Sequence, residues 1–466
     1  MNKPKCPVHT VSETATALNT GWPAGPKRRL LGWSLLSQLR RDFLGSFQLW
    51  QQQYGNVIHL DIWPEHEIIV ADPALARELL VTHHQALIRW EHAIQVFSQF
   101  DGHSVLTTEG QTWKQKREAL QPSFTQKNLQ QFIPQIVAAT EQAVQSYTTS
   151  AKPVETLLTA LTMDIITRLL FSNALTGEEM TKAPQAVHTL LMHANAEFYV
   201  PMKVPHWLPW KWEKRRALNY LRQWIDQHIQ ARLALDDANW SPDLLSQLLH
   251  LHQQDPTAWS LTSVADECMT LFLAGHETTA VTLRWWLWCM ATHPQAQMQA
   301  REEIAQVLGQ SAPTAETLGQ LNYLQQTLKE TMRLYPAAPT LLTRRSTQAI
   351  QLGNWQFPAR TLFIVPLYLM QQDAEWFENP KRFMPERFDG KTTPPRGSYM
   401  PFGIGTRVCL GQHLATTEMV VIASMLLQRF NLTLTEPMSF DGMKAVFNVS
   451  LRPEKNLPIK LEPLNS

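Results

Sequence analysis

Hydrophobic residues recur at helical spacing over most of the chain, while strand-like runs are few and short. Two such runs, 57–60 and 67–70, lie on either side of a turn that contains proline and predict a hairpin near the N-terminus. Further short strands are predicted within 339–351, 361–367, 430–434 and 446–452. The pattern therefore indicates a mainly α fold with small β-sheets.

Several helices follow from the same spacing, at 74–82, 111–121, 262–293, 321–334 and from 410 towards 430, with a mostly helical stretch over 128–235. The helix at 262–293 would be about 48 Å long at 1.5 Å per residue. Its centre, 271–274, is apolar all round, which predicts a helix buried in the interior. The segment 83–106 is rich in aromatic residues and is expected to be irregular.

Composition supports a large folded body and excludes some partners. Hydrophobic residues make up 44% of the 466 residues and charged residues only 17%, so a sizeable core is expected. With 41 basic and 40 acidic residues, nothing favours nucleic acid. We expect a flexible tail over 1–21 and one folded domain over 22–466, because the first twenty residues are followed by a Pro/Gly hinge.

The N-terminal residues contain no apolar run long enough for a signal peptide or a membrane anchor. Four cysteines in so long a chain do not form a disulfide framework, which favours a reducing cytoplasm. The sequence therefore predicts a cytoplasmic protein.

One cysteine lies in an unusual setting. Cys409 follows a glycine-punctuated loop and precedes an apolar helix, where backbone N–H groups and the positive end of the helix favour a thiolate. Gly403, Gly405 and Gly411 would let this loop adopt unusual dihedral angles, and Arg407 would add a cation near the sulfur. The alternative is a small buried core cysteine, which is the usual fate of a single intracellular cysteine.

The helix at 262–293 contains polar residues where its surroundings are apolar. Glu277 and Thr278 follow Gly275 in this buried segment, although a buried carboxylate without a partner is costly. Gly275 and Thr278 would let the helix open locally and form a groove for a small ligand. The alternative is that both polar side chains bond the backbone of their own helix.

The cysteine loop resembles the ligand signature of the cytochrome P450 family, matching it at Phe402, Gly405, Arg407, Cys409 and Gly411, with Ala415 also matching. The resemblance implies a triangular α-rich body with a β-rich N-terminal region. It also implies haem b, with Cys409 as the proximal iron ligand and Phe402, Arg407, Gly411 and Ala274 in contact with the cofactor. Thr278 would then position dioxygen and its protons, and Glu277 would relay protons from solvent.

Two further positions are implied to hold haem propionates. Trp113 and Arg117 are four residues apart and share a helix face, as in the family, where such a pair binds a propionate. The alternative is a solvated basic face that includes Lys114 and Lys116, and these lysines would suit an acidic redox partner. Arg344 aligns with another propionate-binding arginine of the family, with Arg345 next to it as a rival.

The resemblance also implies a group of structural residues. Glu330 and Arg333 lie three apart on one helix face and, taken alone, would form an exposed salt bridge of little consequence. In the family such a pair joins an arginine, here Arg387, to fix the haem-binding core. Many relatives have the four residues His-Arg-Asp-Pro at one position of the chain. Here the first of the four is Gln371 instead of histidine, which weakens any functional role for that position.

The resemblance implies a haem-thiolate monooxygenase that inserts one oxygen atom from O2 into an apolar small molecule such as a fatty acid or terpenoid. Electrons would come from a separate ferredoxin or flavodoxin-type donor, and the chain, which has no predicted anchor, would be a monomer of the soluble, mostly bacterial branch. The loop 200–210 would cover the substrate channel, although its tryptophans also suit a membrane surface. Pocket candidates are Trp90, Phe97, Leu341 and Phe447. The alternatives are a peroxide-driven peroxygenase, an isomerase, or a haem sensor without catalysis.

Overall fold

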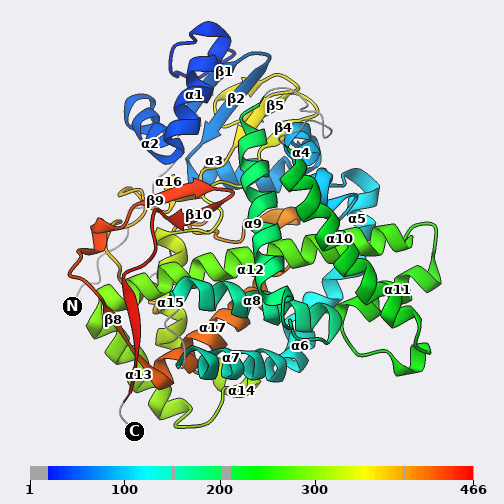
Figure 1. The fold of residues 1–466 in the computed structure, drawn as a ribbon. Helices are drawn as coiled ribbons and strands as arrows, with labels where there is room; N and C mark the ends of the chain where they lie inside the picture. Colours follow the sequence, from blue (N-terminus) through cyan, green and yellow to red (C-terminus); the bar gives the residue numbers. More distant parts are fainter. Residues whose placement is uncertain (1–18, 149–152, 201–210, 392–393, 465–466) are drawn as a thin grey trace, which may run out of the picture.

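The computed structural model describes residues 19–148, 153–200, 211–391 and 394–464. Figure 1 shows a roughly triangular molecule with a broad helical body and a narrower β-rich part, in which the N-terminal strands lie beside β4 (Arg344–Ser346) and β5 (Ile350–Leu352). Residues 1–18 of the predicted tail and most of the predicted channel-covering loop, including Trp207 and Trp210, lie outside the described residues. Asn19, within the predicted tail, pairs with Trp355. Within the described part of the chain, no helix combines the length and the apolarity needed to cross a membrane.

Helices dominate the described residues, as the spacing of apolar residues predicts. They are α1 (Trp33–Arg41), α2 (Phe43–Tyr54), α3 (Pro73–Arg77), α4 (Glu91–Asp101), α5 (Gly110–Leu120), α6 (Gln126–Leu129), α7 (Ile133–Thr148), α8 (Val154–Phe171), α9 (Glu179–Phe198), α10 (Trp212–Leu233), α11 (Leu244–Gln254), α12 (Leu261–Thr292), α13 (Pro294–Val307), α14 (Ala315–Leu318), α15 (Asn322–Leu334), α16 (Leu367–Met370) and α17 (Gln412–Arg429). The mainly α fold class is confirmed.

The β-structure is small and lies mostly in the narrow part of the molecule. One sheet has the strand order β1-β2-β7-β4-β3, formed by Val57–Ile62, Glu65–Val70, Leu362–Ile364, Arg344–Ser346 and Leu87–Arg89. The predicted N-terminal hairpin is confirmed, with Val57 opposite Val70 and Ile62 opposite Glu65. Three separate strand pairs complete the set: β5 (Ile350–Leu352) with β6 (Trp355–Phe357), β8 (Phe430–Leu434) with β11 (Ile459–Pro463), and β9 (Ala445–Asn448) with β10 (Ser450–Pro453).

The long helix α12 runs through the centre of the body and packs against α8, α10 and α17 (Figure 1). Three of its tryptophans, Trp285, Trp286 and Trp288, are fully buried. Each indole N–H still finds a partner: Trp285 Nε1 donates to the Leu451 carbonyl at 2.7 Å, and Trp286 Nε1 donates to Thr327 Oγ1 at 2.9 Å. Trp288 Nε1 donates to the Phe440 carbonyl at 3.2 Å. The helix is therefore interior along much of its length, because large apolar side chains surround it.

The segment 83–106 differs from its prediction. Instead of an irregular stretch it contains β3 and the helix α4. Ala93, Val96 and Phe100 are buried and recur at helical spacing, so that this face of α4 packs against α9 and α12. The aromatic content hid this spacing because Trp90 and Phe97 are only half-buried and lie outside the buried stripe.

Candidate active site

The cysteine loop has the strained backbone that its glycines predict. Gly403 and Gly405 have φ values of 73° and 75°, which side chains with a Cβ rarely adopt. A Cβ on Gly405 would also lie 2.6 Å from the carbonyl oxygen of Leu80, so this position admits only glycine. Gly411 differs, since its φ is −86° and a Cβ there would meet nothing within 4 Å. The Cys409 N–H donates to the Phe402 carbonyl at 2.9 Å and closes the loop just before α17.

Cys409 is accessible, whereas Cys268 and Cys289 are buried; Cys6 lies outside the described residues. The many protein atoms around the Cys409 sulfur nevertheless shield it from bulk water and raise its pKa, while the Gly411 N–H and Arg117 act in the opposite direction. The expectation that Arg407 supplies the cation near the sulfur is wrong. Its guanidinium lies elsewhere, because a closer carboxylate and an aromatic ring attract it.

Arg407 belongs to a cluster of arginines. Its guanidinium carbon lies 3.6 Å from the centre of the Trp113 ring, and one of its nitrogens bonds Glu109. Arg89 Nη1 donates to the same carboxylate at 2.9 Å. Arg344 is buried close enough for Arg407 to lower its pKa, which burial and this repulsion bring to about 10. Burial and the same neighbours lower the pKa of Arg89 to about 9.

This cluster suits a ligand with two carboxylates. Arg89, Arg344 and Arg407 lie around one carboxylate, that of Glu109, and Arg117 lies near Arg407. Arg407 Nη1 is buried and has no hydrogen-bond partner among the described residues. Buried donors are normally paired. Haem carries two propionates, so both the excess positive charge and the unpaired donor fit that cofactor.

Arg344 and Arg345 have different partners. Arg345 donates to Glu65 at 2.7 and 2.8 Å and also pairs with Glu91, so carboxylates of the protein already occupy it. Arg344 donates to the Leu342 carbonyl at 2.7 Å and faces Arg407. Sequence reasoning missed Arg89 and Glu109, since neither is part of a motif. Glu109 does precede Trp113 by four residues, which places it at the N-cap of α5.

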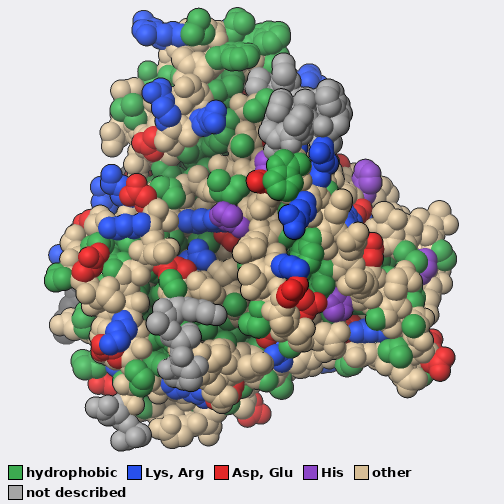
Figure 2. Space-filling model, in the orientation of Figure 1, with side chains coloured by type: hydrophobic (Ala, Val, Ile, Leu, Met, Phe, Trp, Pro, Cys, Tyr) green, Lys and Arg blue, Asp and Glu red, His purple; other side chains and the backbone are tan. Residues whose placement is uncertain are grey.

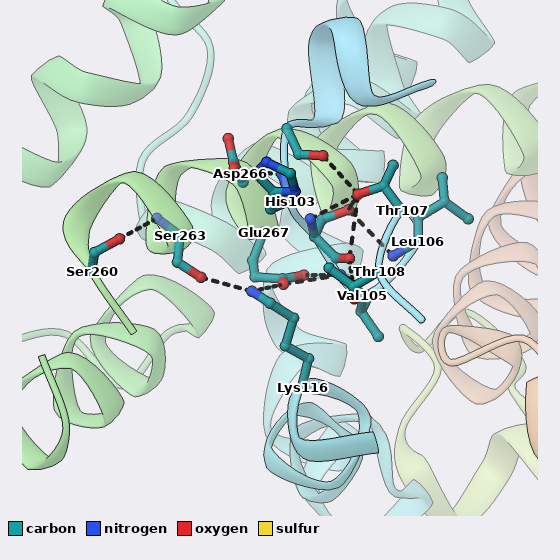
Figure 3. Close-up of polar contacts among 12 residues, drawn as sticks. His103, Val105, Leu106, Thr107, Thr108, Lys116, Ser260, Ser263, Asp266 and Glu267 are labelled. Atoms are coloured by element: carbon teal, nitrogen blue, oxygen red, sulfur yellow. Dashed lines mark hydrogen bonds and ion pairs between the residues drawn. The ribbon is translucent and has the colours of Figure 1, made fainter. Parts of the chain in front are cut away.

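The loop before α5 is fixed to α12 by buried acids (Figure 3). Glu267 accepts from the Val105 N–H at 3.0 and 3.1 Å and from Lys116 Nζ at 2.9 Å. Asp266 accepts from the His103 N–H at 2.7 Å. Lys116 is therefore buried and paired rather than presented to a redox partner, and the alternative of a wholly solvated basic face on α5 is wrong.

The site residues predicted on α12 do not all lie on the same side of the helix. Ala274 and Thr278 are the exposed positions of an otherwise largely buried centre, and the Thr278 hydroxyl donates to the Ala274 carbonyl at 3.0 Å. The expected local opening is wrong, because α12 runs unbroken through Gly275. A Cβ on Gly275 would lie 2.9 Å from Ile166 Cδ1, so this glycine lets α8 approach closely.

Glu277 faces β10. Its carboxylate accepts from Ser450 Oγ and from Arg452 Nη2, both at 2.8 Å. The alternative that it bonds its own helix backbone is therefore wrong, whereas that alternative holds for Thr278. The Glu277 side chain is 14% exposed, and its ion pair with Arg452 compensates for the partial burial of the carboxylate.

Glu330, Arg333 and Arg387 are brought together as the resemblance implies. Both carboxylate oxygens of Glu330 accept from Arg333, at 2.7 and 2.8 Å, and Arg387 Nε lies 3.2 Å from Glu330 Oε1. Gln371 contributes more to the structure around this cluster than its place in the sequence indicated. Its carbonyl accepts from Arg333 Nη1 at 2.7 Å, and its side chain links the Met332 carbonyl to the Met400 N–H of the segment leading to Cys409.

Two of the pocket candidates, Trp90 and Phe97, lie near Phe198. Trp90 lines a cavity of about 110 Å³ together with Leu36, Trp63, Phe198 and Tyr199. The Phe97 ring lies 5.4 Å from that of Phe198. Leu341 lies against Gly403 of the cysteine loop, and the Phe447 ring lies 4.7 Å from Phe43.

The fold, the cysteine loop and the arginine cluster together define a haem-thiolate protein. The sequence model of the family described as "Cytochrome P450" matches residues 23–460, and the chain belongs to this family. It is 27% identical over 428 residues to cytokinin hydroxylase of Arabidopsis thaliana, covering 89% of this chain and 82% of that protein. It is 30% identical to cytochrome P450 72A552 of Barbarea vulgaris, and the match covers 82% of this chain and 77% of that protein. It is 27% identical to Protein LUTEIN DEFICIENT 5, chloroplastic, of Arabidopsis thaliana, and the match covers 81% of this chain and 67% of that protein.

The protein is therefore a cytochrome P450 monooxygenase whose haem is bound through a cysteine. The three relatives are plant proteins, and the placement in a soluble, mostly bacterial branch stays a prediction.

Proposed function

We propose that this enzyme inserts one oxygen atom from O2 into an apolar small molecule of the fatty acid or terpenoid class and reduces the other atom to water. Electrons come from a separate ferredoxin or flavodoxin-type protein. The observation that supports this most strongly is the accessible pair Ala274 and Thr278 on the otherwise buried centre of α12. One relative is a cytokinin hydroxylase, which supports a small organic substrate.

In this proposal Cys409 binds the haem iron, and the bound haem supplies oxygen activation, which a thiolate ligand favours by donating electron density. Arg344 and Arg407 bind the propionates, together with Arg117 and with Trp113, whose ring Arg407 covers. Phe402 and Gly411 border the cofactor on the cysteine side. The open space beside Gly411 suits a flat ligand lying against the loop.

Thr278 and Glu277 deliver protons from two different positions. The Thr278 hydroxyl donates to the Ala274 carbonyl, so its lone pairs stay free to accept a proton donor on the reactive side. Glu277 exchanges protons on the side of α12 that faces β10, where its carboxylate bonds Ser450 and Arg452. The peroxygenase and isomerase alternatives do not need this acid and alcohol pair.

The test compares two electron sources. The purified haem-loaded enzyme is incubated with lipids, terpenoids and aromatics, either with NAD(P)H and a surrogate ferredoxin system or with hydrogen peroxide alone. We expect product only or mainly in the first case, carrying one atom from isotopically labelled O2. Equal turnover with peroxide alone would establish the peroxygenase alternative instead.

Replacing Thr278 by alanine is expected to lower coupled product formation about tenfold or more and to release hydrogen peroxide, because a positioned proton carrier is lost. The measurement is the ratio of product to NAD(P)H consumed. Thr279→Ala is the matched control, since Thr279 is the next residue but is buried and bonds Gly275. Unchanged coupling in Thr278→Ala, or equal uncoupling in both variants, would contradict the role of Thr278.

A further inference from the structure

A small cavity in the narrow β-rich part of the molecule is bordered by aromatic residues. Its volume is about 110 Å³, and its lining includes Trp63, Trp90, Phe198 and Tyr199. These residues come from the turn between β1 and β2, from the position before α4, and from the end of α9. The faces of aromatic rings carry negative potential and attract cations. A lining of this kind is therefore typical of a site for a positively charged group.

The lining also contains two acids, Glu65 and Glu67, and no lysine or arginine among the described residues. The two acids are two positions apart on β2 and therefore share one face of the strand. Glu65 accepts from Arg345 Nη1 and Nη2 at 2.8 and 2.7 Å, and Arg345 Nε bonds Glu91. One arginine thus lies among three acids, and the surroundings of the cavity keep a net negative charge.

Glu67 is the acid of this group that has no partner. It is 9% exposed, yet its carboxyl group makes no hydrogen bond or ion pair with any described residue. Burial, followed by the charge of Glu65, raises the pKa of Glu67 to about 7, while Arg345 acts in the opposite direction. Buried polar groups are normally paired, so Glu67 lacks a partner that a ligand in the cavity would supply.

The size and the surface position of the cavity limit the ligand. Trp63 belongs to the lining and is 57% exposed, so the cavity reaches the surface of the narrow part, where Figure 2 shows hydrophobic side chains. A water molecule occupies about 30 Å³ of the liquid, so the cavity holds a group of several heavy atoms. Within the described part of the chain, no three metal-ligating side chains come together, which disfavours a metal ion.

We propose that this cavity binds a small organic cation, a quaternary ammonium group of the choline type, with the Glu67 carboxylate as its counter-ion. The site shares no residue with the cysteine loop, the arginine cluster or the accessible side of α12, so the inference does not depend on the proposed oxidation. Trp90, predicted from the sequence to line the substrate pocket, belongs to this separate site. A free ammonium ligand is favoured over a phospholipid headgroup, because a phosphate would meet Glu65 and Glu91.

The test measures the binding of choline to the haem-loaded full chain by isothermal titration calorimetry at constant ionic strength. A quaternary nitrogen has no lone pair, so ligation of the haem iron does not contribute. The neutral analogue 3,3-dimethyl-1-butanol has the shape of choline without its charge, and glycerophosphocholine adds a phosphate. We expect choline to bind about tenfold more tightly than either. Equal binding of the neutral analogue would overturn the proposal, whereas equal binding of glycerophosphocholine would support the cation site and assign it to a phospholipid headgroup.

Two variants test the lining. Glu67→Gln should weaken choline binding about tenfold and Trp90→Leu about threefold to tenfold, because the counter-ion or one aromatic face is lost. Trp33→Leu is the matched control and should bind choline normally, since Trp33 is 52% exposed and lies outside the lining. Unchanged binding in both Glu67→Gln and Trp90→Leu would overturn the site. If Glu67→Gln does not fold, Trp90→Leu decides alone.

The pH dependence tests Glu67 separately. A bound cation favours the charged carboxylate, so choline should bind the wild-type protein about tenfold more tightly at about pH 8 than at about pH 6. The other groups at this face are Glu65, Glu91 and Arg345, which pair with one another, and His92, whose Nε2 lies 3.1 Å from a backbone carbonyl oxygen of α9. Glu67→Gln should lose the pH dependence. A dependence that survives in this variant would come from His92 and would contradict the role of Glu67.

Discussion

Replacing Cys409 by serine is expected to abolish the absorption band of the reduced carbon monoxide complex from which the family takes its name. A serine hydroxyl does not ionise at neutral pH, so the iron would lose its thiolate ligand and monooxygenase turnover would be lost with it. Cys409 is the accessible cysteine among the described residues, and the loop that presents it is closed by the bond from its own N–H to Phe402. The measurement is the difference spectrum of dithionite-reduced protein with and without carbon monoxide.

Cys268→Ser and Cys289→Ser are the controls for this prediction. Both thiols are fully buried on α12, and burial raises the pKa of each far above its usual value, so neither suits a thiolate ligand. Both variants should keep the band. Survival of the band in Cys409→Ser, or its loss in either control, would contradict the assignment of Cys409 as the ligand.

The helices that the sequence predicts best are those in which burial is continuous. The segment 262–293 corresponds to α12 at Leu261–Thr292, and 321–334 corresponds to α15 at Asn322–Leu334. Their apolar side chains are buried against other elements along most of the length, so local spacing and tertiary packing require the same structure. In α4 the apparent spacing of the sequence and the packing of the fold disagreed, because half-buried aromatic residues lie beside the buried stripe of Ala93, Val96 and Phe100.

The backbone of the cysteine loop is predictable for a similar reason, since the positive φ values of Gly403 and Gly405 are local properties of these residues. The partner of Arg407, in contrast, is not predictable from the local sequence. Glu109 lies 298 residues away in the sequence, and only the folded chain brings it to the cluster. The spacing of the motif therefore located the loop but misplaced the charge beside the sulfur.

Arg344 and Arg345 illustrate the same limit. The residues are chemically identical neighbours on β4, and successive side chains of a strand point to opposite faces. One arginine therefore meets Glu65 and Glu91, and the other faces Arg407. Which face belongs to the cofactor depends on how the sheet packs, and the sequence of the strand does not contain that information.

Replacing Arg333 by leucine is expected to destabilise the protein by about 3–5 kcal/mol, because the buried carboxylate of Glu330 loses its bidentate partner and keeps only Arg387 and the Met384 N–H on one oxygen. Glu330 and Arg333 are both fully buried. The same change removes the bond from Arg333 Nη1 to the Gln371 carbonyl, and the Gln371 side chain bonds the backbone at Met400 ahead of the cysteine loop. The variant should therefore also bind less haem. Urea unfolding followed by circular dichroism and by the haem absorbance measures both effects.

Arg429→Leu is the matched control, since Arg429 pairs with Glu141 and the side chains of the two residues are 36% and 37% exposed. Partly exposed ion pairs contribute about 0–1 kcal/mol, so this variant should unfold near the wild-type urea midpoint and bind haem normally. Equal destabilisation in both variants would mean that burial of the Glu330 pair is not the cause. A stable Arg333→Leu protein with normal haem content would show that Arg387 and the Met384 N–H, which lies 3.0 Å from Glu330 Oε1, suffice to satisfy the carboxylate.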